Sequence, residues 1–161
     1  MDKEKKELLN EFVVSYLTTF KNIEELVSKP TVKYGLSFEH FTILREISLS
    51  PEPTTLTQLA ENRGVTKGAV ARQLKGLIIN DLIEQDRRQK DRRFAYITLS
   101  EKGQEILNNV TGEVVERWDG WIDKFGADNA WKLLKLMNKL HEDILSDDLG
   151  RRYNLDILKN A

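Results

Sequence analysis

The stretch LTQLAENRGVTKGAVARQLKGL, residues 56–77, constrains the fold more than any other part of the chain. A small residue, Ala60, is followed four positions later by Gly64, and Val70 comes six positions after that. In a helix-turn-helix a small residue lets two helices cross closely, glycine adopts the left-handed turn, and the apolar residue anchors the second helix on the first. The spacing therefore predicts helices over about 55–62 and 67–80. A helical hairpin with another role remains open at this point.

The second of these helices has two unlike faces. At 100° per residue its apolar face holds Val70, Leu74, Leu77 and Ile78. The opposite face carries Gly68, Arg72 and Lys75. A basic face with a small residue near the helix N-terminus is suited to entry into the major groove of DNA.

A basic run, DRRQKDRRF at residues 86–94, follows this helix. Its bases are Arg87, Arg88, Lys90, Arg92 and Arg93. The alternating stretch FAYITL (94–99) predicts a strand, and residues 82–85 are its expected partner. A basic hairpin directly after a recognition helix is typical of a winged helix, in which the wing reaches a neighbouring groove. The alternative is that the run is only a solvated surface turn.

Charge is distributed unevenly along the chain. Residues 62–93 contain nine bases and four acids, a net charge of +5, whereas the whole chain has a net charge of -1. The remainder therefore carries -6. An acidic remainder repels phosphate and restricts contact with a polyanion to one surface.

Helical periodicity flanks this central region on both sides. Apolar residues recur every three or four positions from about residue 3 to 28, with Pro30 expected just beyond the helix end. A further helix is expected after Ser37 and before Pro51. Two long helices are expected after Ser100. The first ends before Gly126, and the second carries Trp131, Leu134, Met137, Leu140 and Ile144. Residues 149–161 show no clear period and are expected to form a loosely held tail or a short terminal helix.

Residues 57–103 resemble the winged-helix core of the MarR family of bacterial transcriptional regulators. The most specific marks are Asp91-Arg92-Arg93 in the wing and the sequence LSEKG at 99–103. The resemblance implies that Asp91 braces Arg93, which enters the minor groove. It also implies a homodimer in which N- and C-terminal helices interlock and two winged domains are spaced for a palindrome.

The expected fold is mainly α with a small β-wing, in one MarR-like domain spanning residues 1–161. The winged helix-turn-helix core is assigned to 37–100, the dimerisation helices to 1–36 and 101–148, and the tail to 149–161. Aromatic residues of the flanking helices offer more apolar surface than a small winged core needs. The alternative is that these aromatics form the core of a monomer.

The expected DNA-binding residues lie on the recognition helix and the wing. They are Thr66, Lys67, Gly68, Arg72, Lys75, Arg87, Arg88, Lys90, Asp91, Arg92 and Arg93. This chain departs from the family pattern at Gly68, Ala69 and Ala71, where hydroxyl residues that contact phosphates are frequent, and Thr66 is the nearest substitute. It also has Arg63 where an apolar residue is usual, and Asp81 where glycine is usual.

The predicted function is a DNA-binding transcriptional regulator, a repressor that responds to a small-molecule effector and binds a palindromic operator in double-stranded DNA as a homodimer. The expected lining residues of the effector site are Tyr16, His40 and Phe41, which combine apolar area with polar tips, although core packing is an alternative for all three. A different class stays open: a winged helix that binds proteins and not DNA.

Enzymatic and metal-dependent functions find little support in the sequence. The two histidines, His40 and His141, lie in no nucleophile, phosphate-loop or metalloprotease motif, and a metal site usually needs three or four ligands. No catalytic residue, cofactor or metal is therefore predicted. The chain has no cysteine and no apolar run of membrane-spanning length, so we expect a cytoplasmic protein without a thiol switch.

Overall fold

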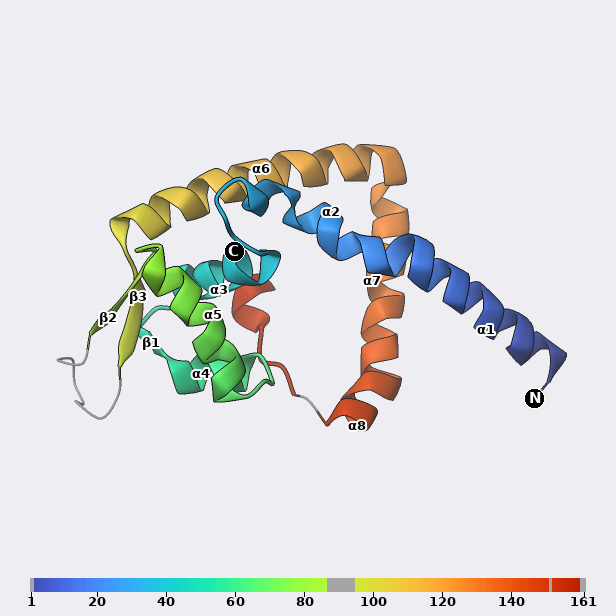
Figure 1. The fold of residues 1–161 in the computed structure, drawn as a ribbon. Coiled ribbons are helices and arrows are strands. Elements are labelled where there is room, and N and C mark those ends of the chain that lie inside the picture. Colours follow the sequence, from blue (N-terminus) through green and yellow to red (C-terminus); the bar gives the residue numbers. More distant parts are fainter. Residues whose placement is uncertain (1, 87–94, 151, 160–161) are drawn as a thin grey trace. The chain divides into compact units, whose positions relative to one another are not determined.

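The computed structural model describes residues 2–86, 95–150 and 152–159 (Figure 1). The chain separates into two compact units, residues 1–38 and residues 39–161, each with its own architecture. Within the described ranges, no helix has the length and apolar character needed to cross a membrane.

The first unit is a continuous helical segment. It consists of α1 (Lys3–Ser15), the π-helical turn η1 (Tyr16–Phe20) and α2 (Lys21–Val32). The predicted helix is confirmed, but the expectation that Pro30 lies beyond its end is wrong, because α2 continues to Val32. A proline in the last turn removes one backbone hydrogen bond, and here the Thr31 hydroxyl donates to the Ser28 carbonyl at 2.7 Å and helps to hold that turn.

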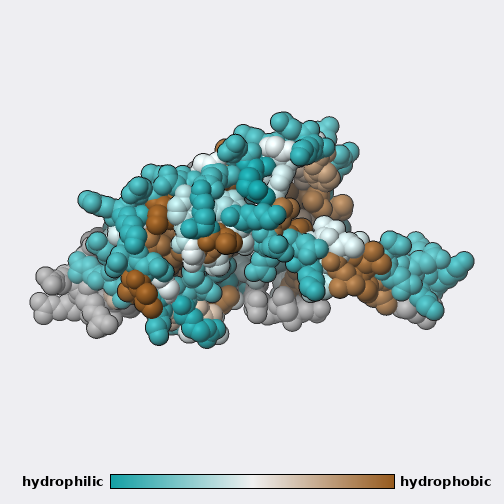
Figure 2. All heavy atoms as spheres, turned by 45° about the horizontal axis from the view of Figure 1, so that its top comes forward, coloured by the Kyte–Doolittle hydropathy of each residue, from teal (hydrophilic) through white to brown (hydrophobic). Residues whose placement is uncertain are grey.

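Large apolar side chains of α1 and η1 are open to solvent. No residue of α1 or η1 is buried, and Phe12 is 56% exposed. Figure 2 shows the resulting apolar surface on α1, bordered by hydrophilic residues toward the N-terminus.

The second unit contains the predicted winged core. Its elements are α3 (Phe38–Leu49), β1 (Thr54–Thr55), α4 (Leu56–Asn62), α5 (Lys67–Ile79), β2 (Ile83–Asp86) and β3 (Tyr96–Leu99). Thr55 caps α4 with a capping box, in which its hydroxyl accepts from the Gln58 backbone N–H and the Gln58 side chain accepts from the Thr55 backbone N–H. Helices α4 and α5 form the helix-turn-helix, and they begin and end within a residue or two of the expected bounds, 55–62 and 67–80.

The strands form an antiparallel sheet in the order β1-β3-β2. Ile83 lies opposite Leu99 and Asp86 opposite Tyr96, which confirms the predicted pairing of these two segments. The strand β1 was not expected, since two residues are too short to show a period. It forms because Thr54 lies opposite Ile97 on the free edge of β3.

The core of the second unit lies where α3, the helix-turn-helix, the sheet and α6 (Glu101–Phe125) meet. Its most deeply buried side chains are Ile43, Leu44, Leu59, Val70, Leu77, Leu82, Ile97 and Val110. The turn between α5 and β2 uses Asp81 in the left-handed conformation, φ 57°, so aspartate takes the position where glycine is usual.

Helix α6 begins where the sequence predicts. The Ser100 hydroxyl accepts from the Gly103 backbone N–H at 2.9 Å and donates to the Asp81 carbonyl at 2.6 Å. A Cβ on Gly103 would lie 1.9 Å from the Leu82 carbonyl oxygen, so the first turn of α6 approaches the chain before β2 too closely for any side chain. Glycine at this position permits the contact that attaches α6 to the winged core.

The chain ends in a series of helical segments. These are α7 (Ala127–Leu140), the π-helical turn η2 (His141–Leu145), α8 (Ser146–Leu149) and the 3-10 helix η3 (Asp156–Lys159). The backbone N–H of Asn154 donates to the Asn62 carbonyl at 2.7 Å, so the segment before η3 is hydrogen-bonded to the end of α4. Of the two expectations for the tail, the short terminal helix is the one that forms, and the mainly helical fold with a small sheet is confirmed.

Candidate nucleic-acid interface

The turn between α4 and α5 has the geometry that its sequence predicts. Ala60 is 4% exposed and Val70 is 2% exposed, so both lie in the crossing of the two helices. Gly64 has φ 57°, and a Cβ there would also lie 2.4 Å from the Arg152 carbonyl oxygen. The Val65 backbone N–H donates to the Ala60 carbonyl at 3.1 Å, which closes the turn. The triplet of small, glycine and apolar residues therefore builds a helix-turn-helix.

The N-terminus of α5 is exposed and capped by Thr66. The Thr66 Oγ1 accepts a hydrogen bond from the Ala69 backbone N–H at 3.2 Å. This bond occupies an acceptor position of the hydroxyl and leaves its proton free to be donated. The first N–H groups of a helix and its dipole attract anions, and Lys67 adds a positive charge at the same end. Thr66 can thus hold the helix and donate to a phosphate at the same time.

The outer face of α5 is open along its length. Arg72 and Lys75 are exposed, and a Cβ on Gly68 would meet no atom within 4 Å. Val70, Leu74 and Leu77 form the buried face as predicted. The expectation that Ile78 shares this face is wrong, because its side chain is 40% exposed. At 100° per residue Ile78 lies about 80° around the helix from Val70, whereas Leu74 and Leu77 lie within about 40° of it, so Ile78 is at the edge of the buried face.

The wing residues expected to bind DNA fall outside the described part of the chain. These are Arg87, Arg88, Lys90, Asp91, Arg92 and Arg93. The pair Asp86 and Tyr96 is the last rung of the β2–β3 ladder before this segment. The antiparallel pairing thus places Asp86 and Tyr96, which flank this segment in the sequence, opposite one another.

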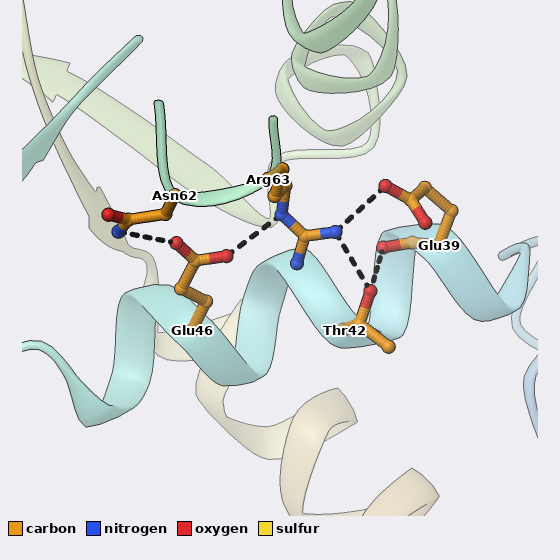
Figure 3. A network of polar contacts seen from close by, with 5 residues as sticks. All are labelled: Glu39, Thr42, Glu46, Asn62 and Arg63. Carbon is orange, nitrogen blue, oxygen red and sulfur yellow. Dashed lines mark hydrogen bonds and ion pairs between the residues drawn. The ribbon is translucent and has the colours of Figure 1, made fainter. Parts of the chain in front are cut away.

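Sequence reasoning missed a polar network beside the helix-turn-helix, in which Arg63 and Glu46 are buried and Glu39 is 51% exposed (Figure 3). Arg63 stands where the MarR pattern usually has an apolar residue, and its side chain is only 8% exposed. Its Nε donates to Glu46 Oε2 at 2.8 Å and its Nη1 donates to Glu39 Oε1 at 2.8 Å. Glu39 and Glu46 lie seven residues apart and share one face of a helix, but this spacing alone does not identify Arg63 as their partner.

The three expected effector residues have different environments. In the first unit, Tyr16 is 51% exposed and begins η1. In the second unit, Phe41 is 3% exposed in the core. His40 lies against α5, since a Cβ on Gly76 would be 3.3 Å from His40 Nε2. Burial lowers the pKa of His40, although Glu39 and a hydrogen bond to the Gln73 backbone oppose this shift.

A surface pocket of about 270 Å³ lies elsewhere in the second unit. It is lined by the end of α3, the prolines of the loop before β1, β3 and the start of α6, including Ile47, Pro53 and Leu99. None of the three expected effector residues lines it. In the part of the chain that the structure describes, no three histidine, aspartate or glutamate residues gather as metal ligands. The His141 ring instead meets the Tyr153 ring edge-on, with 5.5 Å between ring centroids.

Comparison with known proteins connects this geometry to a family. The model of the transcriptional regulator family SarA/Rot matches residues 25–110, more than half of the chain. An uncharacterised HTH-type transcriptional regulator of Staphylococcus aureus strain Mu50 is 30% identical over 143 residues, covering 88% of this chain and 94% of that protein.

Solved structures agree with this match. Staphylococcus aureus MarR in complex with salicylate and kanamycin is 28% identical with a TM-score of 0.70, covering 89% of this chain and 96% of that one. The transcriptional repressor CouR, bound to a 23-mer DNA duplex, has a TM-score of 0.71 at 22% identity, covering 86% of this chain and 95% of that one. At this identity the likeness shows that the two proteins share a fold. The protein is therefore a DNA-binding transcriptional regulator that belongs to the SarA/Rot family and has the winged-helix fold of MarR regulators.

Proposed function

We propose that this protein is a repressor that binds a palindromic operator as a homodimer and releases it when a small molecule binds. The observation that carries the proposal is the outer face of α5, where Arg72 and Lys75 are exposed beside a glycine with open space around it. This face can approach base edges in a major groove without a steric clash. Membership of the SarA/Rot family of transcriptional regulators supports DNA binding by this protein.

The DNA contacts divide into two kinds. Thr66 and Lys67, at the N-terminus of α5, contact phosphate and set the register of the helix. Arg72 and Lys75 read base edges in the major groove.

In the wing, Asp91 braces Arg93, which inserts into a minor groove where narrow A·T tracts concentrate negative potential. The bases Arg87, Arg88, Lys90 and Arg92 contact phosphates beside it.

Exposed apolar residues support the homodimer. In the first unit they include Phe12, Tyr16 and Phe20, and in the second unit Trp118 and Trp131. Soluble monomers seldom expose so many large apolar side chains on neighbouring helical turns. A second copy of the chain covers these faces by the isologous contact of a two-fold dimer, and this arrangement spaces two α5 helices for a palindrome.

The effector is an apolar, aromatic or anionic small molecule. The related Staphylococcus aureus MarR was solved with salicylate, an aromatic anion. His40, partly exposed against α5, is the proposed lining residue here, because Phe41 is buried in the core and Tyr16 belongs to the first unit. A ligand shifts a conformational equilibrium only through its differential affinity for the two states. Salicylate should therefore weaken operator binding, and operator should weaken salicylate binding by the same factor. Equal salicylate affinities with and without operator would remove the effector from the proposal.

The test begins with selection of DNA fragments by the purified protein and sequencing of the bound pool. A palindromic motif, bound by two chains per duplex, is the expected result. Arg93→Ala should then weaken binding to that motif by about 1–3 kcal/mol per half-site, and Asp91→Ala should weaken it less. No enrichment of any motif, with no salt-dependent DNA binding, would favour the protein-binding alternative.

A further inference from the structure

Arg63 joins the helix-turn-helix to α3 through directional charge-assisted hydrogen bonds. It is the C-cap residue of α4 and its side chain is 8% exposed. Its guanidinium contacts two carboxylates of α3, Glu39 and Glu46, each at 2.8 Å. Figure 3 shows the guanidinium between them, with the α3 helix running below. The end of α4 is thus attached to α3 by charged groups at a position where apolar packing would suffice.

The carboxylate of Glu46 is the centre of this network. It is 3% exposed, and both of its oxygens accept hydrogen bonds. Arg63 Nε binds one oxygen and Asn62 Nδ2 binds the other at 3.0 Å. The last residue of α4 and its C-cap residue therefore converge on one side chain of α3, which restricts rotation of α4 about the α3 axis.

Toward the start of α3 a second pair of contacts prevents tilting. Arg63 Nη1 donates to Thr42 Oγ1 at 3.2 Å as well as to Glu39. The Thr42 hydroxyl itself donates to the Glu39 carbonyl at 2.9 Å, which orients its oxygen toward the guanidinium. Glu39, Thr42 and Glu46 lie on one face of α3 across two helical turns, so the guanidinium is held along the helix as well as around it.

This network adds direction more than stability. Desolvation of a buried ion pair offsets most of its attraction, and apolar residues of similar volume often stabilise a core as well or better. In the described part of the chain, Arg63 Nη2 is buried without a hydrogen-bond partner, which is a further cost. Charge-assisted bonds do, however, impose angles that apolar contacts do not.

The orientation of α4 is transmitted directly to α5. Arg63 is followed by the glycine of the turn, by Val65 and by Thr66, the N-cap of α5. The bond from the Val65 N–H to the Ala60 carbonyl closes this turn, and Ala60 and Val70 are buried where the helices cross, so a change in the orientation of α4 should carry α5 with it. We propose that Arg63 is a positioning residue for DNA recognition, an inference that rests on the proposed function. Through its bonds to Glu39 and Glu46, Arg63 holds α5 at the angle that matches the major groove.

A matched pair of substitutions tests this proposal. Glu39→Ala removes one anchor of Arg63, and Glu61→Ala removes an exposed carboxylate of α4 that has no bond to Arg63. Both variants lose one negative charge, so simple electrostatics should strengthen DNA binding in both. At pH 8, where His40 is neutral in both variants, we expect Glu39→Ala to bind the selected operator at least about fivefold more weakly than Glu61→Ala. Equal operator affinity of the two variants would overturn the proposal.

A second variant separates positioning from stability. Replacing the pair by apolar residues, Arg63→Met with Glu46→Met, leaves no unpaired buried charge and should keep the melting temperature near that of the parent. We expect its preference for operator over random DNA to fall at least about tenfold. A stably folded double variant with the discrimination of the parent would contradict the positioning role. If the double variant does not fold, the operator affinities of Glu39→Ala and Glu61→Ala still test the positioning role of Arg63.

A readout without DNA distinguishes failure of this inference from failure of the proposed function. Amide hydrogen exchange in the first turns of α5 should be at least about fivefold faster in Glu39→Ala than in Glu61→Ala, because the anchored end of α4 opens more often. A parent protein that selects no DNA would refute the proposed function, and the exchange rates would then decide the orienting role of Arg63 alone. Equal exchange in the two variants overturns that role.

Discussion

Single glycine positions show how closely the segments of the second unit approach one another. Gly103 leaves no room for a Cβ, which would lie 1.9 Å from the Leu82 carbonyl oxygen. Gly112 lies in the same helix, and a Cβ there would meet nothing within 4 Å. The two glycines have the same backbone conformation class and opposite surroundings, so they form a natural pair for comparison.

Gly103→Ala should destabilise the protein by about 1–3 kcal/mol, because backbone atoms rather than a flexible side chain must move to admit the methyl group. Gly112→Ala should stabilise it by about 0.5–1 kcal/mol through its higher helix propensity. Urea unfolding of both variants measures the two changes. A Gly103→Ala variant as stable as Gly112→Ala would show that the contact at Leu82 is loose.

His40 should make stability depend on pH. Burial lowers its pKa in the folded protein, so below the ordinary value of about 6.5 the unfolded chain binds more protons than the folded one. The free energy of unfolding should therefore fall as pH decreases from about 6.5 through the folded pKa, and this contribution is fully present above pH 6.5. In His40→Gln the fall should be shallower over the same range. Parallel pH profiles of the two proteins, measured by urea unfolding, would contradict the assignment.

At the scale of elements, we expect α5 and the segment between β2 and β3 to make different kinds of contact with DNA. Helix α5 presents a short open face between its capped N-terminus and its middle. The most basic segment of the chain lies in the sequence between β2 and β3. A helix in a groove supplies base contacts, and a flanking basic segment supplies phosphate contacts and charge.

Substitutions in the two elements should therefore differ in kind. Arg72→Ala should flatten the preference among operator variants, because a side chain on the groove face reads base edges. Arg88→Ala should weaken binding to all sequences alike and lower the slope of log affinity against log salt by about one. Affinities for a panel of operators at several salt concentrations distinguish the two. Equal losses on operator and random DNA for Arg72→Ala would show that it contacts phosphate.

At the scale of the whole molecule, the exposed apolar helices point to assembly. Helix α7 buries only Ala130, whereas Trp131 in the same turn is 72% exposed. Such a helix is unfavourable in a dissolved monomer and favourable in a contact between copies.

Trp131→Glu should shift the protein from dimer toward monomer, because a charge would replace a large apolar side chain in the contact. Lys132→Glu, at the next position on α7, serves as the control because its side chain already carries a charge. Sedimentation equilibrium over a range of concentrations measures both. A Trp131→Glu dimer as tight as the parent would place the contact on other helices.

The local features of this protein could be predicted from its sequence. The small residue, glycine and apolar anchor at Ala60, Gly64 and Val70 define the helix-turn-helix, since each is a steric requirement within a dozen residues. The cap at Ser100 and the alternation in β3 are likewise local signals. The outward positions of Arg72 and Lys75 followed from helical geometry alone.

Other features depended on segments that meet only in the folded chain. Arg63 could not be recognised as buried from its neighbours in sequence, because its partners Glu46 and Glu39 lie 17 and 24 residues away on another helix. The two-residue strand β1 exists only because β3 offers a free edge. The sequence by itself determined the helices and the β2–β3 pair, because those choices depend on local sterics and periodicity. The tertiary structure alone decided how the helix-turn-helix is held on α3, because burial of a charge depends on which distant groups arrive to bind it.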